Sequence, residues 1–324
     1  MTASSFLIKL DEQLDRGPVV LATVMQCTGS TPRQPGAQMA CGPDWLLGTI
    51  GGGAAESKVI TAARLSINDQ KPSEVTIDLR GTLDHLKDGI CGGTMLIRLD
   101  PLDLACRSNL QEANRKLADG HAIQQLFPPD GSWSLQTLDD TAPSQPDERW
   151  ILKPDPMLLI VGAGHCGVAL AHSAASIGFR IILQDDRPEM APVAELPAGT
   201  IRSSTPVDQT LNAINWPDPL YIALVTRSYQ HDVDAILHLA TKTVKYAGLM
   251  GSRRRLHQVM KMLREHDVPE SFIEFLDAPI GIDLPVETPE EIAVSICASL
   301  IQVRNADSRR SAPLAPDTAV PLGC

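Results

Sequence analysis

The chain has 324 residues, of which 43% are hydrophobic and 21% are charged. This length is typical of two domains, and this composition lets each domain bury a core, so a single small module and a disordered chain are both excluded. The 28 basic and 39 acidic residues give a formal charge of −11. Most of such a surface repels a phosphate backbone, so we expect no nucleic-acid partner.

No apolar run is long enough to cross a bilayer, and the opening segment, MTASSFLIKLDEQ, lacks the basic region and the apolar stretch of a secretory signal. We therefore expect a cytoplasmic protein that makes no membrane contact. The seven cysteines are scattered and include no C-x-x-C pair, so the pattern indicates reduced thiols rather than a disulfide framework or a zinc site.

The first half of the chain predicts an α+β domain over residues 1–153. Apolar residues recur at helical spacing between Phe6 and Leu14, and Gly17 follows a basic last turn, so a first helix is expected to stop there. Apolar and β-branched runs then predict strands and one more helix. In chain order these are expected at 19–25, 38–40, 45–47, 54–63 (the helix), 74–79 and 94–99, with hairpins up to about residue 150.

A proline-rich stretch with Asp and Ser, residues 128–156, marks a domain boundary, which we place near Lys153. Beyond it, strands at 158–161, 180–184, 220–225 and 246–249 alternate with helices at 168–177, 233–240 and 254–263, and a last helix spans 289–303. This alternation is typical of a parallel, doubly wound sheet. The fold class is therefore α/β, with a Rossmann-like domain over 154–304. The polar residues 305–324 are expected to form a flexible tail.

Gly162, Gly164 and Gly167 form a G-x-G-x-x-G motif between an apolar strand and a helix, and an acidic pair, Asp185 and Asp186, lies at the end of the next strand. Such glycines allow a tight turn and close approach to a phosphate, and the acid can bind ribose hydroxyls. The segment therefore predicts a βαβ unit that could hold a nucleotide. An alternative stays open, in which the glycines only pack the helix against the strand and the acid contacts Arg187.

Two loops of the first domain could form an anion site. One is a glycine cluster before its second helix, and the other is the polar segment GSTPR after its first strand. Their backbone amides, hydroxyls and one guanidinium suit a phosphate monoester, while a pair of tight turns is the alternative explanation of the glycines. The candidate residues are Ser30, Thr31, Arg33, Gly51, Gly52 and Gly53.

Cys91 precedes two glycines at the entrance of a strand. A thiolate there could ligate a soft metal or relay sulfur, and the alternative is an inert buried thiol. Cys91 is therefore the candidate metal ligand.

An arginine run follows the last predicted strand and begins with Arg253, at the sheet edge where ligands of such folds bind. We expect Arg253 to clamp a phosphate. Thr226, Arg227, His231 and Asp232 follow another strand and are expected to face the same crevice. No motif in the sequence assembles a nucleophile with its base, so no catalytic residue is assigned.

These motifs belong to longer blocks of sequence. The blocks are GSTPRQPGAQM, GTIGGGAAE, ICGGTM, LLIVGAGHCGVALA with QDDRPEMA, TRSYQHD, YAGLMGSRRR and PIGIDLPVETPEEIAVSI. Together, and in this order over most of residues 1–303, they resemble the XdhC/CoxI family of xanthine dehydrogenase accessory proteins. The chain departs from the family pattern at Asp277, where histidine is frequent, and at 284–286, where Leu-Pro-Val replaces Ile-Gly-Ala.

The resemblance implies a protein that binds molybdenum cofactor (molybdopterin), protects it during sulfuration, and inserts it into an apo xanthine dehydrogenase-type molybdenum hydroxylase. It also implies a cysteine desulfurase that supplies the sulfur, and a homodimer. The first domain would hold the cofactor, with Arg33 and the glycines 51–53 on its phosphate and Cys91 on molybdenum. The Rossmann domain would bind a nucleotide, grip the pterin phosphate or dimerise.

The alternative function is an NAD(P)-dependent oxidoreductase whose cofactor occupies the glycine motif. The sequence contains no convincing hydride-transfer constellation. An accessory protein with little or no turnover is therefore favoured over an enzyme.

Overall fold

The computed structural model describes residues 1–79, 92–128, 133–138, 149–187, 193–214 and 220–306. The chain divides into two compact units, Met1–Asp155 and Pro156–Cys324, close to the boundary predicted at Lys153. Most of the predicted tail, from residue 307 onward, lies outside the described residues. No helix within the described ranges is long and apolar enough to cross a membrane.

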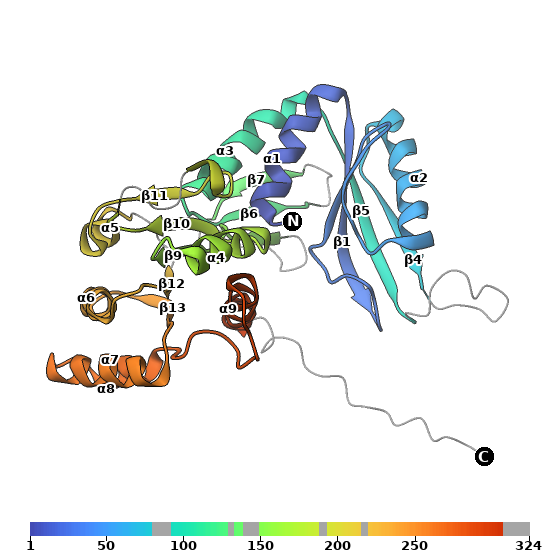
Figure 1. Ribbon diagram of the computed structural model, residues 1–324. Helices are drawn as coiled ribbons and strands as arrows, with labels where there is room; N and C mark the ends of the chain where they lie inside the picture. Colours follow the sequence, from blue (N-terminus) through green and yellow to red (C-terminus); the bar gives the residue numbers. More distant parts are fainter. Residues whose placement is uncertain (80–91, 129–132, 139–148, 188–192, 215–219, 307–324) are drawn as a thin grey trace, which may run out of the picture. The chain divides into compact units, whose positions relative to one another are not determined.

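The first unit is built on a five-stranded antiparallel sheet with the order β3-β2-β1-β5-β4. Figure 1 labels β1, β5 and β4 of this sheet. Its strands are β1 Val19–Thr28, β2 Gln38–Cys41, β3 Leu46–Gly48, β4 Ser73–Asp78 and β5 Thr94–Leu102. Each of them lies where an apolar run predicts a strand. The predicted α+β architecture of this unit is therefore confirmed.

Helices cover both faces of this sheet because successive residues of β1 point to opposite sides. Leu21 packs with α1 (Ala3–Gln13) and α3 (Arg107–Ala118), whereas Ala22 packs against α2 (Gly53–Asp69). A strand that is buried on both faces needs an unbroken apolar run instead of alternation. This explains the sequence of β1.

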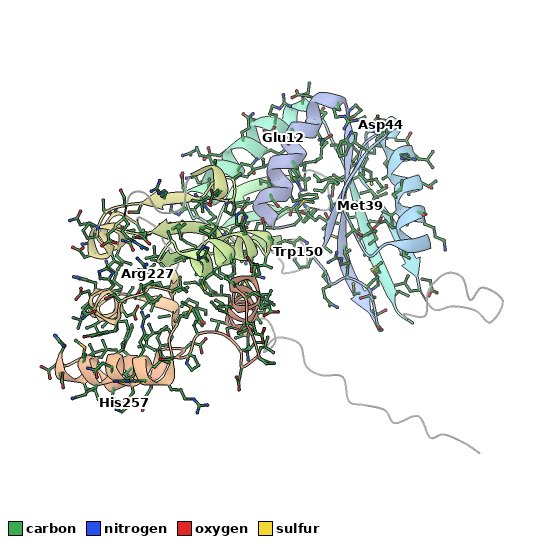
Figure 2. The ribbon with its side chains drawn as sticks, viewed as in Figure 1. Glu12, Met39, Asp44, Trp150, Arg227 and His257 are labelled. Atoms are coloured by element: carbon green, nitrogen blue, oxygen red, sulfur yellow. The ribbon has the colours of Figure 1, made fainter. Side chains whose placement is uncertain are left out.

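The first helix is present, but it ends at Gln13, and a 3₁₀ turn over Leu14–Arg16 carries the chain to Gly17. Thr2 and Ser5 form a reciprocal capping box, in which each side chain accepts a backbone N–H of the other. After the helix the chain turns at Gly17, whose φ of +118° suits glycine. Figure 2 shows Glu12 of α1 at the surface and Met39 of β2 inside the unit, where it is fully buried.

The segment between β5 and the unit boundary is the part that the sequence predicts least. It contains α3 and a three-stranded antiparallel sheet of order β7-β6-β8, with β6 Ile123–Leu126, β7 Ser134–Thr137 and β8 Arg149–Leu152. Hairpins are expected here and are present. The helix α3 is not expected, because only Leu110, Ala113 and Leu117 are buried in an otherwise polar sequence.

The second unit has a five-stranded parallel sheet of order β11-β10-β9-β12-β13. Its strands are β9 Met157–Val161, β10 Arg180–Gln184, β11 Ile201–Ser203, β12 Leu220–Leu224 and β13 Val244–Leu249. The order reverses on either side of β9, as in doubly wound folds. The predicted Rossmann-like class is therefore confirmed, and the short β11 is an addition to the prediction.

Two layers of helices cover this sheet. One face carries α4 (His165–Ser176) and α9 (Pro289–Arg304), which pack on Leu158 and Ile160. The other face packs around Leu159. It carries α5 Val207–Ala213, α6 Tyr229–Leu239, α7 Arg253–Glu265 and α8 Glu270–Phe275. Short 3₁₀ turns lie at Leu14–Arg16, Leu104–Cys106 and Val193–Glu195.

Asp277, which departs from the family pattern, anchors the chain between α8 and α9. Its backbone bridges to Gly248 in β13. Its carboxylate accepts the hydroxyl of Tyr246 at 2.5 Å and the amide of Gly281 at 3.1 Å. Burial and this carboxylate both raise the pKa of Tyr246, so the phenol stays a donor. Asp277 therefore has a structural role in this chain.

Candidate functional site

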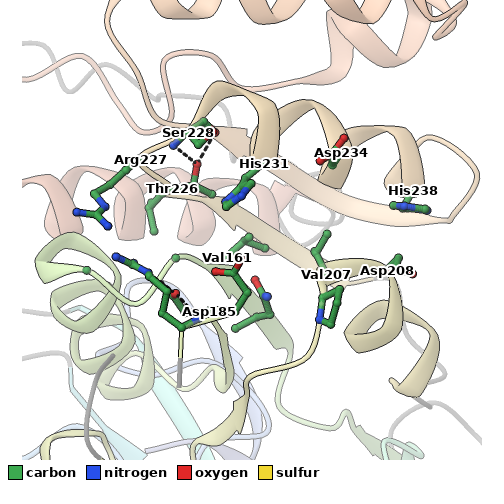
Figure 3. A pocket seen from close by; sticks show the side chains of 17 residues that line it. Val161, Asp185, Val207, Asp208, Thr226, Arg227, Ser228, His231, Asp234 and His238 are labelled. Carbon is green, nitrogen blue, oxygen red and sulfur yellow. Dashed lines mark hydrogen bonds and ion pairs between the residues drawn. The ribbon is translucent and has the colours of Figure 1, made fainter. Parts of the chain in front are cut away.

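The second unit contains a pocket of about 610 Å³ at the carboxyl ends of β9, β10 and β12. It lies where the strand order reverses, which is the usual ligand position in open α/β sheets. Its volume is typical of small-molecule sites. The glycine loop after β9, the ends of the strands and one face of α6 form its walls (Figure 3). The predicted crevice is therefore present.

The three glycines of the G-x-G-x-x-G motif have different roles. Gly162 has a φ of +110°, which makes the turn after β9. A Cβ on Gly167 would lie 1.9 Å from the carbonyl oxygen of Gly162, so this glycine permits close packing of α4 against the loop. A Cβ on Gly164 would meet nothing within 4 Å, and Gly164 lines the pocket. Only Gly164 combines open space with a place in the pocket wall.

The acid after β10 is already fully engaged. Asp185 accepts four N–H donors: the amide of Ala163 at 2.8 Å, and the amide, Nε and Nη2 of Arg187 at 3.1, 2.8 and 2.7 Å. Burial acts to raise the pKa of Asp185, but these donors outweigh it and hold the pKa below its ordinary value. The contact between the acid and Arg187, which the sequence left as an alternative, is therefore present.

The segment after β12 supplies the opposite wall of the pocket. Thr226, Arg227 and His231 line it, as expected. Arg227 is exposed and forms no ion pair with any residue of the described ranges. Asp232, by contrast, is fully buried and lies 2.7 Å from the hydroxyl of Thr226, so it does not line the pocket. Arg227 is the available cation of this wall.

One arginine of the run at the start of α7, Arg255, has a structural role. Arg255 donates from Nε to the buried carboxylate of Asp232 at 3.0 Å, and its Nη2 contacts both Asp232 and Thr226. Ser252 caps the helix, and Arg253 beside it is exposed and is not among the residues that line the pocket. Arg255, which the sequence does not distinguish from its neighbours, ties α7 to β12 and α6.

Three glycine-containing loops of the first unit lie together. A Cβ on Gly51 would lie 2.5 Å from Cγ of Pro32, so the glycine cluster packs directly on the GSTPR segment. A Cβ on Gly93 would lie 2.5 Å from the carbonyl oxygen of Ser30. The segment that follows Cys91 therefore adjoins the same loop. Cys91 itself lies outside the described residues.

An internal carboxylate occupies part of the expected amide cradle. Glu56 accepts the amides of Ile50 and Gly52 at 3.2 and 3.0 Å and the hydroxyl of Thr49 at 2.5 Å. The amide of Gly51 donates to the Thr49 hydroxyl at 3.1 Å. These bonds fix the loop, but they also use amides that the sequence assigned to a phosphate.

Of the other predicted residues of this loop group, one makes an internal hydrogen bond and three are exposed to solvent. Thr31 is half-buried, and its hydroxyl donates to the carbonyl of Arg33 at 2.9 Å. Ser30, Arg33 and Gly53 are exposed, and the Arg33 side chain makes no ion pair within the described part of the chain. The side chains left for a ligand are therefore Ser30 and Arg33.

No group of three or more His, Cys, Asp or Glu side chains that could hold a metal ion occurs among the residues that the structure describes. The candidate metal ligand of the sequence, Cys91, is not in that part of the chain.

Two family models match the chain in separate regions. The "XdhC and CoxI family" model matches residues 13–78, and the "XdhC Rossmann domain" model matches residues 158–300, so together they span more than half of the chain.

Full-length similarity agrees with these matches. A Bacillus subtilis protein named as a probable xanthine dehydrogenase subunit is 28% identical over 332 residues, covering 93% of this chain and 98% of that protein. Protein YqeB of Escherichia coli is 26% identical over 298 residues, or 92% of this chain, and this chain spans only 45% of its length. A crystal structure described as a xanthine dehydrogenase from Bacillus halodurans has a TM-score of 0.81 and 26% identity, with 97% and 98% of the two chains covered. The chain therefore belongs to the XdhC and CoxI family.

Proposed function

We propose that this protein is an accessory protein of a xanthine dehydrogenase-type molybdenum hydroxylase, and that it binds molybdenum cofactor and inserts it into the apoenzyme. The observation that carries the proposal is the meeting of three glycine-containing loops in the first unit, around Pro32, Gly51 and Gly93. Family membership and the names of the Bacillus relatives support a role beside xanthine dehydrogenase.

The residues at these loops fit the chemistry of the cofactor. Molybdenum cofactor combines a pterin, a dithiolene that binds molybdenum, and a terminal phosphate. Arg33 and Ser30 offer an exposed guanidinium and hydroxyl, which suit the phosphate. The glycines let a flat ligand approach the backbone closely. The first unit therefore supplies groups for the anionic end, with open space beside the backbone of Gly52 and Gly53.

Glu56 sets the geometry of the loop group through internal hydrogen bonds. Its carboxylate holds Ile50, Gly52 and Thr49 in place. Because this negative charge already binds the loop amides, Arg33 becomes the main positive group for the phosphate. Arg33 is therefore the residue whose loss should weaken cofactor binding most clearly.

Cys91 completes the proposed site as a soft ligand for molybdenum. Its chain neighbours Gly92 and Gly93 adjoin the Ser30 loop, which is consistent with a thiol near the bound cofactor. The family resemblance adds a cysteine desulfurase as sulfur donor during sulfuration, and a homodimeric carrier. The protein would hold and protect the cofactor, and the chemistry of sulfur transfer would belong to the donor.

Retention of the cofactor tests the proposal. The full chain is incubated with molybdenum cofactor and desalted, and molybdenum and pterin are then quantified. Arg33→Ala should bind roughly ten- to a hundredfold more weakly, because a charge-assisted phosphate contact contributes about 1.5–3 kcal/mol. Arg64→Ala, an exposed arginine further along α2, is the matched control and should bind normally. Equal retention by Arg33→Ala would contradict the assignment of this loop.

The alternative function, an NAD(P)-dependent oxidoreductase, would use the pocket of the second unit. That function needs an acid for the ribose hydroxyls. The carboxylate of Asp185 is already saturated by internal donors, which leaves the exposed Asp186 of the same wall for this role. Titration with NADH, followed by nicotinamide fluorescence, separates the two functions. The accessory role predicts that the protein retains molybdenum cofactor and that NADH does not displace it.

A further inference from the structure

The pocket of the second unit has two chemically different ends along α6. His231 and His238 both line it, and helical geometry separates them by about 10 Å along the axis. Arg227 lies towards the His231 end, and Asp208 lies towards the His238 end (Figure 3). A ligand that fills the pocket therefore meets different groups at its two ends.

The first end suits an anion. Arg227 is exposed there and forms no ion pair with the rest of the described chain. Gly164 is the N-cap residue of α4, a helix of 12 residues, and it provides no side-chain hydrogen bond to the first amides. The space beside Gly164 is open, and the first turn of the helix contains no acid. A guanidinium that faces uncapped helix amides across a pocket is a strong setting for a phosphate.

The second end suits N–H donors. Asp208 lies at this end, and Asp234 lies about midway between the two histidines on α6 (Figure 3). Both are charged acceptors that line the pocket, and neither forms an ion pair within the described ranges. They repel phosphate and accept amino groups. Between the two ends the wall is apolar, and its residues are Val161, Pro206, Val207 and Val225.

The wall near β10 has two acids, Asp185 and Asp186, and only one of them is available to a ligand. Each carboxylate oxygen of Asp185 accepts two N–H groups, so no lone pair remains for a ribose diol. The guanidinium of Arg187 is held against this carboxylate and forms part of the pocket wall. Asp186, the next residue, also lines this wall and is exposed, so a ribose diol would meet Asp186 and not Asp185.

We propose that this pocket binds a purine nucleoside phosphate, and that it prefers guanine to adenine. The phosphate lies between Arg227 and the start of α4, the ring lies on the apolar wall, and the base edge meets Asp234 and Asp208. Guanine offers two adjacent N–H donors that match one carboxylate, whereas adenine offers a single amino group beside ring acceptors. The proposal concerns the second unit alone and does not depend on the proposed function of the first.

Calorimetric titration of the full chain with GMP, AMP and inorganic phosphate tests the site. GMP should bind more tightly than AMP, and phosphate should compete with both. Arg227→Ala should weaken GMP binding by roughly tenfold or more, because a charge-assisted phosphate contact is lost. Arg254→Ala is the matched control, since this arginine is exposed and does not line the pocket; it should bind GMP normally.

Gly164→Asp separates binding from folding. Aspartate is a preferred N-cap residue, and its Cβ would meet nothing within 4 Å, so the variant should melt at or above the temperature of the parent. Its carboxylate would occupy the anion end and abolish GMP binding. Asp234→Asn should reduce the preference for GMP over AMP, whereas the exposed Asp283→Asn should not.

Three results would overturn the proposal. One is the absence of GMP binding at millimolar concentration. Another is unchanged GMP affinity in folded Arg227→Ala and Gly164→Asp. The third is displacement of GMP by molybdenum cofactor, which would assign the pocket to that cofactor; retention of cofactor by Arg33→Ala is measured separately and tests only the first unit.

Discussion

Removal of Arg255 should cost the second unit a large part of its stability. The carboxylate of Asp232 is fully buried, and its partners are Thr226 and Arg255. Arg255→Ala deletes its only salt-bridge partner among the described residues and leaves a charge in the protein interior. Breaking a buried pair in this way costs about 3–5 kcal/mol. For a unit of this size the melting temperature should fall by roughly 6–20 °C.

The stability that Arg255→Ala loses should also depend on pH. Burial already raises the pKa of Asp232, and the hydrogen bonds from Thr226 and Arg255 act against that rise. Without Arg255 the folded-state pKa rises further above the unfolded value of about 3.9. A group of this kind contributes stability below its unfolded pKa and loses it as pH rises through its folded pKa. The difference in stability between the parent and Arg255→Ala should therefore be smaller at pH 5 than at pH 8.

Thermal unfolding followed by circular dichroism measures both effects. Arg253→Ala and Arg254→Ala are matched controls from the same run, since both side chains are exposed, and each should change stability by less than about 0.5 kcal/mol. Adding Asp232→Asn to Arg255→Ala should recover part of the loss, because a neutral amide is cheaper to bury. Equal melting temperatures for the three single variants would refute the structural role of Arg255.

Two further predictions follow from the glycine motifs. Gly167→Ala should destabilise the second unit by about 1–3 kcal/mol or more, since its Cβ would lie 1.9 Å from the Gly162 carbonyl oxygen. In the same denaturant titration Gly164→Ala should cost less, about 1 kcal/mol at most, because its Cβ meets open space and only the N-cap preference is lost. Cys91→Ser should weaken retention of the metal-loaded cofactor more than that of the metal-free pterin, because serine lacks a soft thiolate; equal retention of both forms would exclude a metal contact.

Strong local patterns account for most of the fold that could be predicted. β9 is an apolar run followed by glycines, and α9 begins at Thr288 with Pro289 and Glu291 in capping positions, so both elements are visible in the sequence. α3 shows only a sparse apolar stripe, and α5 and α8 are too short to give a period. Their stability comes from tertiary packing, which sequence alone does not reveal.

The candidate sites were predictable as regions but less so as contacts. The sequence brings the GSTPR segment and the glycine cluster into one site, and the packing of Gly51 on Pro32 agrees with this. It does not reveal that Glu56 binds the loop amides, because the direction of an N–H depends on loop dihedral angles.

The arginine run shows the same limit. Residues two apart on a helix lie about 200° apart, so Arg253 and Arg255 cannot both face the sheet. The sequence does not say which of them does. The structure gives the inward position to Arg255.

The most direct test of the accessory role is transfer of the cofactor to its client. An apo xanthine dehydrogenase-type enzyme is mixed with free molybdenum cofactor or with the same amount bound to this protein, and recovered hydroxylase activity is measured over time. The loaded protein should restore more activity than free cofactor, and Arg33→Ala should restore less than Arg64→Ala. Equal recovery from free and protein-bound cofactor would contradict the proposed function.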